Sequence, residues 1–272
     1  MSTTKEVVFV TGANTGLGYQ IVKNLASSAR PYEILIGSRT VSKGDEALAT
    51  LRREVPDTKS SLSVIQADVS SDSSLEAAVE SIGSRFGHLD ILINNAGHAF
   101  DHLHTEGQMT LREAWNTSWD TNVTGAHVLT HLAVPLLLKA ANPRVLFIAS
   151  GTSCLTEAES LHTAESQRVY GSPVKGWPKE NYFPVQAYRS SKTGLNMAMR
   201  EWHRALFNDG VKVWAVSPGF LATNLHDSGA GGLSKLGAQD PSVGANVVRS
   251  VVEGHHDQDV GKIVRISSIQ PW

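Results

Sequence analysis

The sequence predicts an α/β protein with a single doubly wound parallel sheet of seven strands and helices on both faces of the sheet. Two observations support this fold class. Short apolar runs rich in β-branched residues alternate along the chain with segments that carry apolar residues at three- and four-residue spacing. The runs lack polar alternation, which is typical of strands buried on both faces. Strands that alternate with helices predict a parallel sheet covered by helices on both sides.

Seven apolar runs give the expected strands. In chain order they span residues 7–10, 33–37, 62–66, 91–93, 144–149, 212–216 and 262–266. The helical period is clearest at four places between them. These expected helices span residues 18–28, 74–86, 125–141 and 194–207.

Composition and charge predict one globular domain over residues 1–272. Of the 272 residues, 41% are hydrophobic and 18% are charged, and no linker rich in Gly, Ser or Pro divides the chain. The formal net charge of −2 is too small to attract nucleic acid or an anionic membrane surface. The sequence shows no signal segment and no run of 18 apolar residues, so we expect a cytoplasmic protein.

The cysteine and histidine pattern predicts neither a disulfide nor a metal site. Cys154 is the only cysteine, and we interpret it as a small buried side chain in a reducing compartment. The closest histidine pairs are His102 with His104 and His255 with His256. They lack the four-residue helical spacing of metal ligands and have no neighbouring cysteine.

Two long irregular segments, residues 155–187 and 225–239, interrupt the alternation. The first carries several glycines and prolines, and the second is rich in Gly and Ser. Both follow the carboxyl end of an expected strand, where α/β sheets bind ligands, and long loops in compact domains are usually functional. We interpret them as walls of a substrate pocket. Nearby aromatic residues would either pack in the core or stack on a bulky substrate, namely Trp115, Trp119, Trp177, Tyr182, Phe183 and Phe220.

A glycine-rich turn follows the first expected strand and leads into a helix. It reads Thr-Gly-Ala-Asn-Thr-Gly-Leu-Gly over residues 11–18. Such glycines let the backbone approach a pyrophosphate, whose charge the N-terminus of the next helix stabilises. An ordinary glycine-rich turn is the alternative, but the position within a strand–helix–strand unit favours a dinucleotide site. The residues expected to contact the dinucleotide are Gly12, Asn14, Thr15, Gly16, Leu17 and Gly18.

The spacing of these glycines resembles the Thr-Gly-x-x-x-Gly-x-Gly motif of the short-chain dehydrogenase/reductase family. Asp68-Val69 ends the third strand, where the family places an acidic residue against the adenine, and residues 94–97 read Asn-Asn-Ala-Gly as in the family. Taken alone, residues 94–97 would pass as a turn, and so would the Pro218-Gly219 pair after the sixth expected strand. The resemblance covers residues 7–266 and implies a Rossmann-type fold. The further cofactor contacts that it implies are Asp68, Val69, Asn95, Ala96, Gly97, Pro218, Gly219 and Thr223.

The end of the second expected strand predicts NADP(H) as the cofactor. Enzymes that select NAD place a carboxylate there for the ribose hydroxyls, whereas a guanidinium suits a 2′-phosphate. Here Ser38 replaces the acid, Arg39 follows, and Lys43 lies one helical turn further on. An exposed arginine after a strand is often only a solvated surface charge, but the missing acid favours NADP(H).

A Tyr–Lys pair stands where the family carries its Tyr-x-x-x-Lys motif. Tyr188 and Lys192 are four residues apart, which places them on one face of a helix. A phenol with a pKa near 10 is a poor proton shuttle at neutral pH, and we expect the Lys192 ammonium to lower that pKa. The resemblance makes Tyr188 the general acid and gives Lys192 the additional task of holding the nicotinamide ribose.

The resemblance adds Ser150 and Asn122 to the catalytic group. Ser150 takes the catalytic position of the family's Ser-Ser-x-x-Ser segment and would polarise the substrate carbonyl. A serine that ends a strand is also a common backbone cap, and Ser153 is a rival for the same role. Asn122 matches the family's helical asparagine, which bends the backbone and holds a proton-relay water. Read locally, it is only a mediocre helix former.

Together these residues predict hydride transfer from NADPH to a small-molecule ketone or aldehyde. Two alternatives stay open, a reductase of C=N or C=C bonds on the same fold and a non-catalytic NADP-binding sensor or scaffold. The interval between Ser150 and Tyr188 is longer than is usual in the family. It resembles carbonyl reductases with an inserted segment, some of which are monomers, so both a monomer and a homo-oligomer stay open.

Overall fold

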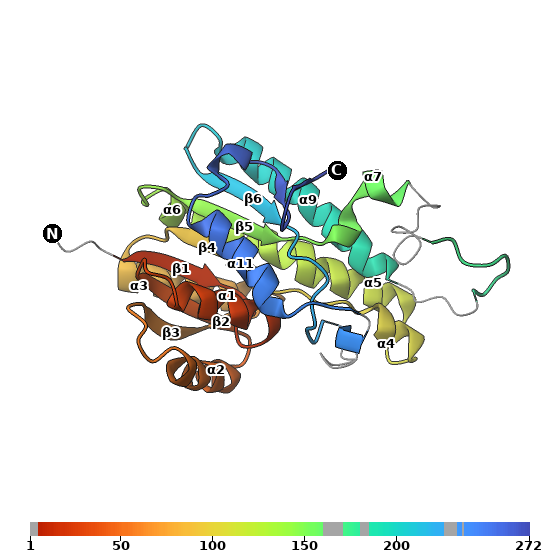
Figure 1. Cartoon of the computed structure of the whole chain (residues 1–272), viewed down its shortest axis with the longest axis horizontal. Helices are drawn as coiled ribbons and strands as arrows, with labels where there is room; N and C mark the ends of the chain where they lie inside the picture. The colour runs from red at the N-terminus through yellow and green to blue at the C-terminus, as the bar shows by residue number, and fades with distance from the viewer. Residues whose placement is uncertain (1–4, 160–170, 180–184, 226–232, 236) are drawn as a thin grey trace.

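A sheet of eight strands lies between two layers of helices in the computed structural model of this chain (Figure 1). The structure describes residues 5–159, 171–179, 185–225, 233–235 and 237–272. The strand order is β3-β2-β1-β4-β5-β6-β7-β8, and all neighbours are parallel except β7 and β8. The strands are β1 (Glu6–Val10), β2 (Tyr32–Ser38), β3 (Ser61–Gln66), β4 (Ile91–Asn94), β5 (Arg144–Ile148), β6 (Lys212–Val216), β7 (Ile263–Val264) and β8 (Ile269–Gln270).

Six longer helices cover the sheet in the described part of the chain, and shorter ones lie between them. The longer helices are α1 (Gly16–Ala26), α2 (Val41–Glu54), α3 (Asp72–Phe86), α6 (Gly125–Leu137), α9 (Gln186–Leu206) and α11 (Pro241–Val252). The shorter ones are α4 (Asp101–Thr105), α5 (Leu111–Trp119), the π-helix η1 (Asp120–Thr124), the 3-10 helices η2 (Gly151–Ser153) and η3 (Asp257–Asp259), and α7 (Leu155–Ala158).

The hydrophobic core has two parts, one on each face of the sheet. Alternate residues of β1 point to opposite faces, with Val7 and Phe9 in one cluster and Val8 and Val10 in the other. The first cluster includes side chains of α3, α6 and α9, and the second includes side chains of α1, α2 and α11. Strands that are buried on both faces explain why the apolar runs in the sequence show no alternation.

The predicted fold class is confirmed, with one correction to the strand count. The sheet has eight strands instead of seven, because β8 turns back from β7 and pairs with it in an antiparallel sense. β8 has two residues, Ile269 and Gln270, and so presents no apolar run that a sequence pattern can show.

Two helix boundaries differ from the expected ones by more than two residues. Helix α6 ends at Leu137, before residue 141, and α9 begins at Gln186, before residue 194. The sequence pattern missed the first turns of α9 because the side chains that they bury include the polar Ser191 and Lys192. A hydrophobic period therefore becomes visible only further along the helix.

The order of the strands places the candidate site. β1 pairs with β2 on one side and with β4 on the other, so the chain leaves β1 in one direction and returns to β4 in the other. In open α/β sheets, ligands bind at the carboxyl edge beside this point. The segments that follow β1, β4, β5 and β6 meet at that edge.

Candidate active site

The glycine-rich turn of residues 11–18 joins β1 to α1. Gly12 and Gly16 have φ angles of +61° and +55°, a left-handed conformation that glycine adopts without a steric cost. At Gly18 the constraint is space, because a Cβ atom there would lie 2.3 Å from the carbonyl oxygen of Gly12. The turn therefore packs backbone against backbone and exposes the start of α1 to a ligand at the carboxyl edge.

The loop after β4 is hydrogen-bonded to this turn. Thr11 Oγ1 accepts hydrogen bonds from the backbone N–H groups of Asn95 and Ala96, both at 3.0 Å. The side-chain amide of Asn95 donates to the carbonyl oxygens of Thr11 at 2.8 Å and Gly12 at 3.2 Å. Two segments predicted to contact the cofactor thus form one connected rim.

The residues predicted to select the dinucleotide lie at the end of β2 and the start of α2. Ser38 is buried, and its hydroxyl donates to the carbonyl oxygen of Thr40 at 2.8 Å. Arg39 and Lys43 are exposed. Lys43 and Asn14 both line a cavity of about 310 Å³ at the surface. Asn14 of the glycine-rich turn and Lys43 of α2 therefore face the same space.

Asp68 and Val69 lie just after β3, separated from it by Ala67, and are partly buried. The Asp68 carboxylate accepts a hydrogen bond from the backbone N–H of Ser70 at 3.1 Å. A Cβ atom at Gly125 would lie 2.1 Å from the carbonyl oxygen of Val69, so the start of α6 packs tightly on this turn. The contact predicted between these residues and an adenine stays a prediction.

The segment after β6 also approaches the glycine-rich turn. Pro218 is buried, and Gly219 has a φ of +99° that turns the chain. A Cβ atom at Gly16 would lie 3.6 Å from Cβ of Thr223. Thr223 is therefore next to the start of α1, and its predicted contact with the nicotinamide end of a cofactor is untested.

Tyr188 and Lys192 lie one turn apart at the start of α9. Both are buried, with exposed fractions of 8% and 4%. The Lys192 ammonium donates to the carbonyl oxygen of Ile148 at 2.8 Å, and its nitrogen lies 6.0 Å from the centre of the Tyr188 ring. A Cβ atom at Gly97 would lie 3.1 Å from the same nitrogen. The Tyr–Lys pair thus lies beside the ends of β4 and β5.

Asn122 is the central residue of η1, the π-helix between α5 and α6. Its side-chain oxygen accepts a hydrogen bond from the backbone N–H of His98, and its amide donates to the carbonyl oxygen of His98, both at 2.9 Å. The same amide donates to Ser191 Oγ at 2.9 Å. Asn122 therefore connects the loop after β4 to α9, at an irregular helical turn of a kind frequent at functional sites.

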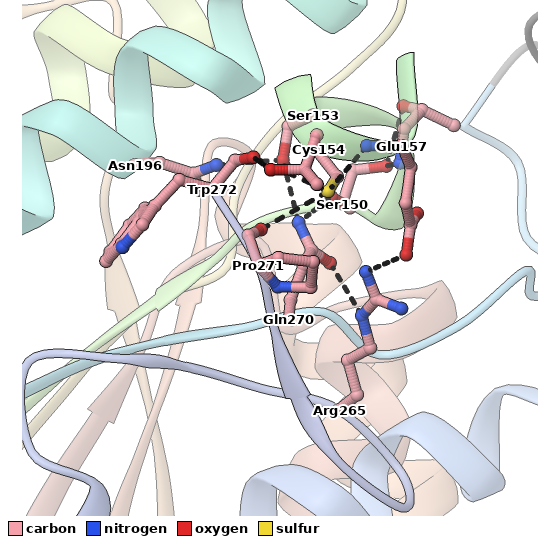
Figure 2. A network of polar contacts seen from close by, with 11 residues as sticks. Ser150, Ser153, Cys154, Glu157, Asn196, Arg265, Gln270, Pro271 and Trp272 are labelled. Carbon is pink, nitrogen blue, oxygen red and sulfur yellow. Dashed lines mark hydrogen bonds and ion pairs between the residues drawn. The ribbon is translucent and has the colours of Figure 1, made fainter. Parts of the chain in front are cut away.

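Ser150 and Ser153 have different surroundings at the end of β5 (Figure 2). Ser153 is 2% exposed, and its hydroxyl donates to the carbonyl oxygen of Ser150 at 2.6 Å and accepts from the amide of Asn196 at 3.0 Å. The Ser150 hydroxyl lies 2.9 Å from that of Thr152. The side chain of Ser150 also forms a hydrogen bond with the side chain of Tyr188. Ser150 therefore has its hydroxyl beside Tyr188, whereas Ser153 holds the turn in place.

Gln270 of β8 supports the same turn from far along the chain (Figure 2). It is 2% exposed, and its amide donates to the carbonyl oxygen of Ser150 at 3.2 Å. Its own side-chain oxygen accepts from Arg265 at 3.1 Å, and Arg265 forms an ion pair with Glu157 at 2.6 Å. Gln270 was not predicted from the sequence, because no local pattern links residues 120 positions apart.

Burial shifts the pKa values of Tyr188 and Lys192. It raises the pKa of Tyr188 from 10.0 to about 12, although the hydrogen bond with Ser150 lowers it in part. It lowers the pKa of Lys192 from 10.5 to about 8. Both shifts follow from the lost hydration of the charged forms. The pKa of Tyr188 therefore shifts upward, not downward as expected, because desolvation outweighs the hydrogen bond with Ser150.

A buried carboxylate beside Tyr188 was not predicted from the sequence either. Asp101 is 7% exposed, and its two oxygens accept hydrogen bonds from the backbone N–H groups of Ala187 at 2.8 Å and Tyr188 at 3.0 Å. The donors come 86 and 87 residues later in the chain, so no spacing pattern indicates the contact.

The two predicted pocket walls are described in part. Within residues 155–187, positions 160–170 and 180–184 lie outside the described residues, and within 225–239 so do positions 226–232 and 236. Where the second wall begins, the carbonyl oxygen of Leu225 accepts from the backbone N–H of Ala99 at 3.2 Å. This hydrogen bond places the start of the wall beside the loop after β4.

The aromatic residues of the predicted pocket differ in exposure. Trp177 is 88% exposed, Phe220 43% and Trp119 38%, and Trp115 is partly buried. The Trp119 ring lies so close to α9 that a Cβ atom at Gly194 would be 2.4 Å from it. Trp119 is therefore a packing residue between α5 and α9. Tyr182 and Phe183 lie outside the described residues.

The described ranges contain no candidate metal site and no candidate membrane-spanning helix. Over these residues, no three His, Cys, Asp or Glu side chains are grouped as metal ligands would be. None of the helices described has the length and apolar character needed to span a bilayer. Cys154 is buried, and its thiol donates to the carbonyl oxygen of Pro271 at 3.3 Å.

Comparison with solved structures shows the fold. A carbonyl reductase from chicken fatty liver, solved with NADPH bound, has a TM-score of 0.77 and 24% identity, over 99% of this chain and 100% of that one. An actinorhodin polyketide ketoreductase variant, solved with NADPH, has a TM-score of 0.73 and 22% identity over 97% of each chain.

Comparison of sequences shows the family. The short chain dehydrogenase family model matches residues 6–161. The short-chain dehydrogenase/reductase tropE of Talaromyces stipitatus is 45% identical over 269 residues, which cover 98% of each chain. The short-chain dehydrogenase/reductase eupG of a Phoma species is 44% identical, again over 98% of each chain. This chain therefore belongs to the short-chain dehydrogenase/reductase family of oxidoreductases.

Proposed function

We propose that this protein reduces a ketone or aldehyde with NADPH. The observation that carries the proposal is the hydrogen-bonded pair of Ser150 and Tyr188, with Lys192 buried beside it, at the same edge of the sheet as the glycine-rich turn. The NADPH-bound carbonyl reductase and ketoreductase with this fold give the proposal further support.

The residues at this edge fit a dinucleotide. Thr15, the N-cap residue of α1, makes no side-chain cap hydrogen bond, and the first turn of the helix contains no acidic residue. The N–H groups at the start of α1 are therefore available to an anion, and the helix dipole favours negative charge there. Gly18 lets the first turn of α1 pack closely against Gly12, which holds these N–H groups at the carboxyl edge. When bound, a reduced nicotinamide supplies the hydride.

The chain's own residues supply the proton. With a pKa of about 12, Tyr188 stays protonated at neutral pH and donates its hydroxyl proton to the carbonyl oxygen as the carbonyl carbon receives the hydride. Ser150 donates a hydrogen bond to the same oxygen and stabilises its developing charge. Lys192, with a pKa of about 8, is largely an ammonium at pH 7 and stabilises the phenolate left on Tyr188. The product is an alcohol.

The proposal is tested by titrating the purified protein with NADPH and NADH, followed by fluorescence. Consumption of NADPH is then measured by absorbance against a panel of ketones, aldehydes and quinones. Tighter binding of NADPH together with turnover of any carbonyl is the expected result. Tight binding with turnover of imines or activated alkenes alone contradicts the carbonyl assignment, and binding without any turnover makes the protein a sensor or scaffold.

Replacing Arg39 with alanine tests the choice of NADPH. A charge-assisted hydrogen bond to a 2′-phosphate contributes about 1.5–3 kcal/mol, so the Kd for NADPH is expected to rise roughly 10- to 100-fold. The Kd for NADH, which lacks the phosphate, is expected to stay the same. Arg52→Ala is the matched control, since Arg52 is also exposed but lies in the last turn of α2, away from the end of β2. Equal losses for both cofactors in Arg39→Ala would contradict the assignment.

Ser150→Ala and Ser153→Ala separate the two candidate serines. Removal of one donor to a developing oxyanion costs about 10²- to 10³-fold in kcat, and we expect this loss in Ser150→Ala with little change in stability. Ser153→Ala leaves buried partners without a hydrogen bond, which costs about 1–3 kcal/mol of the free energy of unfolding. Steady-state kinetics and urea unfolding of both variants check this. A larger loss of kcat in Ser153→Ala would reverse the assignment.

A further inference from the structure

The N-terminus of α9, which carries Tyr188, lacks a cap from its own sequence. Val185 occupies the N-cap position and makes no side-chain hydrogen bond, and the first turn contains no acidic residue. The first backbone N–H groups of any helix have no partner within the helix. Here Asp101 of α4 accepts two of these hydrogen bonds, from Ala187 and Tyr188.

The Asp101 contact combines charge and geometry. Its carboxylate is 7% exposed and accepts at 2.8 and 3.0 Å, one oxygen for each N–H group. A negative charge at a helix N-terminus is favoured by the helix dipole, and hydrogen bonds to an ionised acceptor are stronger than neutral ones. A carboxylate with both oxygens used in this way fixes the direction as well as the position of the first turn. That turn contains Tyr188.

Asp101 ends a segment that starts beside the glycine-rich turn, at the rim that this turn forms with the loop after β4. We call this the cofactor rim. At residue 95, the segment is hydrogen-bonded to Thr11 and Gly12 of the glycine-rich turn. In the middle, the backbone of His98 makes two hydrogen bonds with the side chain of Asn122. The segment of residues 95–101, which we call the strap, therefore connects the glycine-rich turn to α9.

We propose that Asp101 is a positioning residue that sets the place of the Tyr188 hydroxyl relative to the cofactor rim through the strap. This inference rests on the proposed function, in which Tyr188 delivers its proton to an oxygen beside the nicotinamide. A proton donor acts only within hydrogen-bond reach of its target, and a misplacement of about 1 Å can cost about 10²-fold in rate. The strap connects the glycine-rich turn, which is proposed to hold the cofactor, to α9, which carries the Tyr188 hydroxyl. It therefore affects the distance between the proton donor and its target.

Asp101→Ala tests the inference in the full-length protein. We expect kcat to fall about 10- to 100-fold, while the Kd for NADPH and the KM for the carbonyl substrate change less than about two-fold. Asp101→Asn keeps one accepting oxygen and is expected to recover part of the loss. Glu106→Gln is the matched control, because Glu106 is an exposed carboxylate at the end of the same helix, α4, and its side chain accepts a hydrogen bond from Gln108.

Hydrogen exchange gives a readout that does not depend on turnover. In Asp101→Ala, the amides of residues 186–192 are expected to exchange faster, with unchanged protection in the second half of α9. Unchanged exchange at the start of α9, or an unchanged kcat in a variant that binds NADPH fully, overturns the inference. A fall in kcat that only matches the fraction of protein unable to bind NADPH also overturns it, because the role is then structural.

The two proposals fail in different ways. If the unmodified protein binds NADPH but turns over no carbonyl, the proposed function fails, and the exchange measurement still decides whether Asp101 holds the start of α9. If the unmodified protein is active and Asp101→Ala is equally active, the inference about Asp101 fails alone.

Discussion

Replacing Tyr188 with phenylalanine is expected to lower kcat by about 10²- to 10⁴-fold, the range that general acid catalysis supplies. Phenylalanine fills the same buried space and removes only the hydroxyl that carries the proton. The Ser150 hydroxyl remains, so the substrate oxygen keeps one hydrogen-bond donor but loses its proton source. The Kd for NADPH, measured by fluorescence titration, is expected to stay within about two-fold.

Tyr32→Phe is the matched control for this variant. Tyr32 is fully buried, in β2, and its hydroxyl finds no hydrogen-bond partner in the described part of the chain. It lies in the core beneath α1 and α2 and outside the candidate site. Tyr32→Phe should therefore keep full activity and equal or higher stability. Full activity in Tyr188→Phe would refute its role as the acid.

Gly18→Ala is expected to weaken cofactor binding and to destabilise the protein. Its Cβ atom would lie 2.3 Å from the Gly12 carbonyl oxygen, 2.5 Å from the Asn95 amide nitrogen and 2.9 Å from Cα of Ala13. Two of these atoms are backbone and have no room to move aside within the turn. Overpacking of this kind costs about 1–3 kcal/mol of the free energy of unfolding. The distorted turn should also weaken NADPH binding by roughly 10- to 100-fold.

Gly83→Ala is the control for the glycine substitution. Gly83 lies in α3, and the nearest atom to an added Cβ would be a Leu136 side-chain carbon at 3.4 Å. Alanine is a better helix former, so this variant is expected to gain up to about 1 kcal/mol. Urea unfolding and NADPH titration of both variants provide the comparison. Normal NADPH binding by Gly18→Ala would contradict the assignment of this turn as the cofactor site.

Much of the fold was predictable because a buried parallel strand leaves a strong mark in the sequence. The run of residues 212–216 has the same bounds as β6, and the other six expected strands each overlap a strand of the sheet. Two features that were not predicted, β8 and the start of α9, show no clear hydrophobic period. β8 is too short to show one, and the side chains that the first turns of α9 bury include the polar Ser191 and Lys192.

The same reasoning explains which parts of the candidate site were found. Short motifs such as the glycine-rich turn and the Tyr–Lys pair are local, so their spacing along the chain is enough to indicate them. Asp101 and Gln270 act through hydrogen bonds to backbone atoms far away in sequence. Such contacts do not require particular residues nearby in the sequence, so they leave no local pattern that could indicate them. The direction of the pKa shift of Tyr188 could not be predicted from the sequence either, since it depends on how deeply the fold buries the phenol.

The hydrogen bond from Gln270 to Ser150 has a consequence for the order of events during synthesis. The ribosome makes Ser150 first and must add 120 further residues before Gln270 exists. β5 can pair with β4 as soon as both have left the exit tunnel, but the turn that holds Ser150 lacks one of its supports until β8 has emerged. A nascent chain with most of its sheet assembled therefore still has an unfinished turn at Ser150, and the proposed activity is expected to arise only after the translation of β8 and its release from the tunnel.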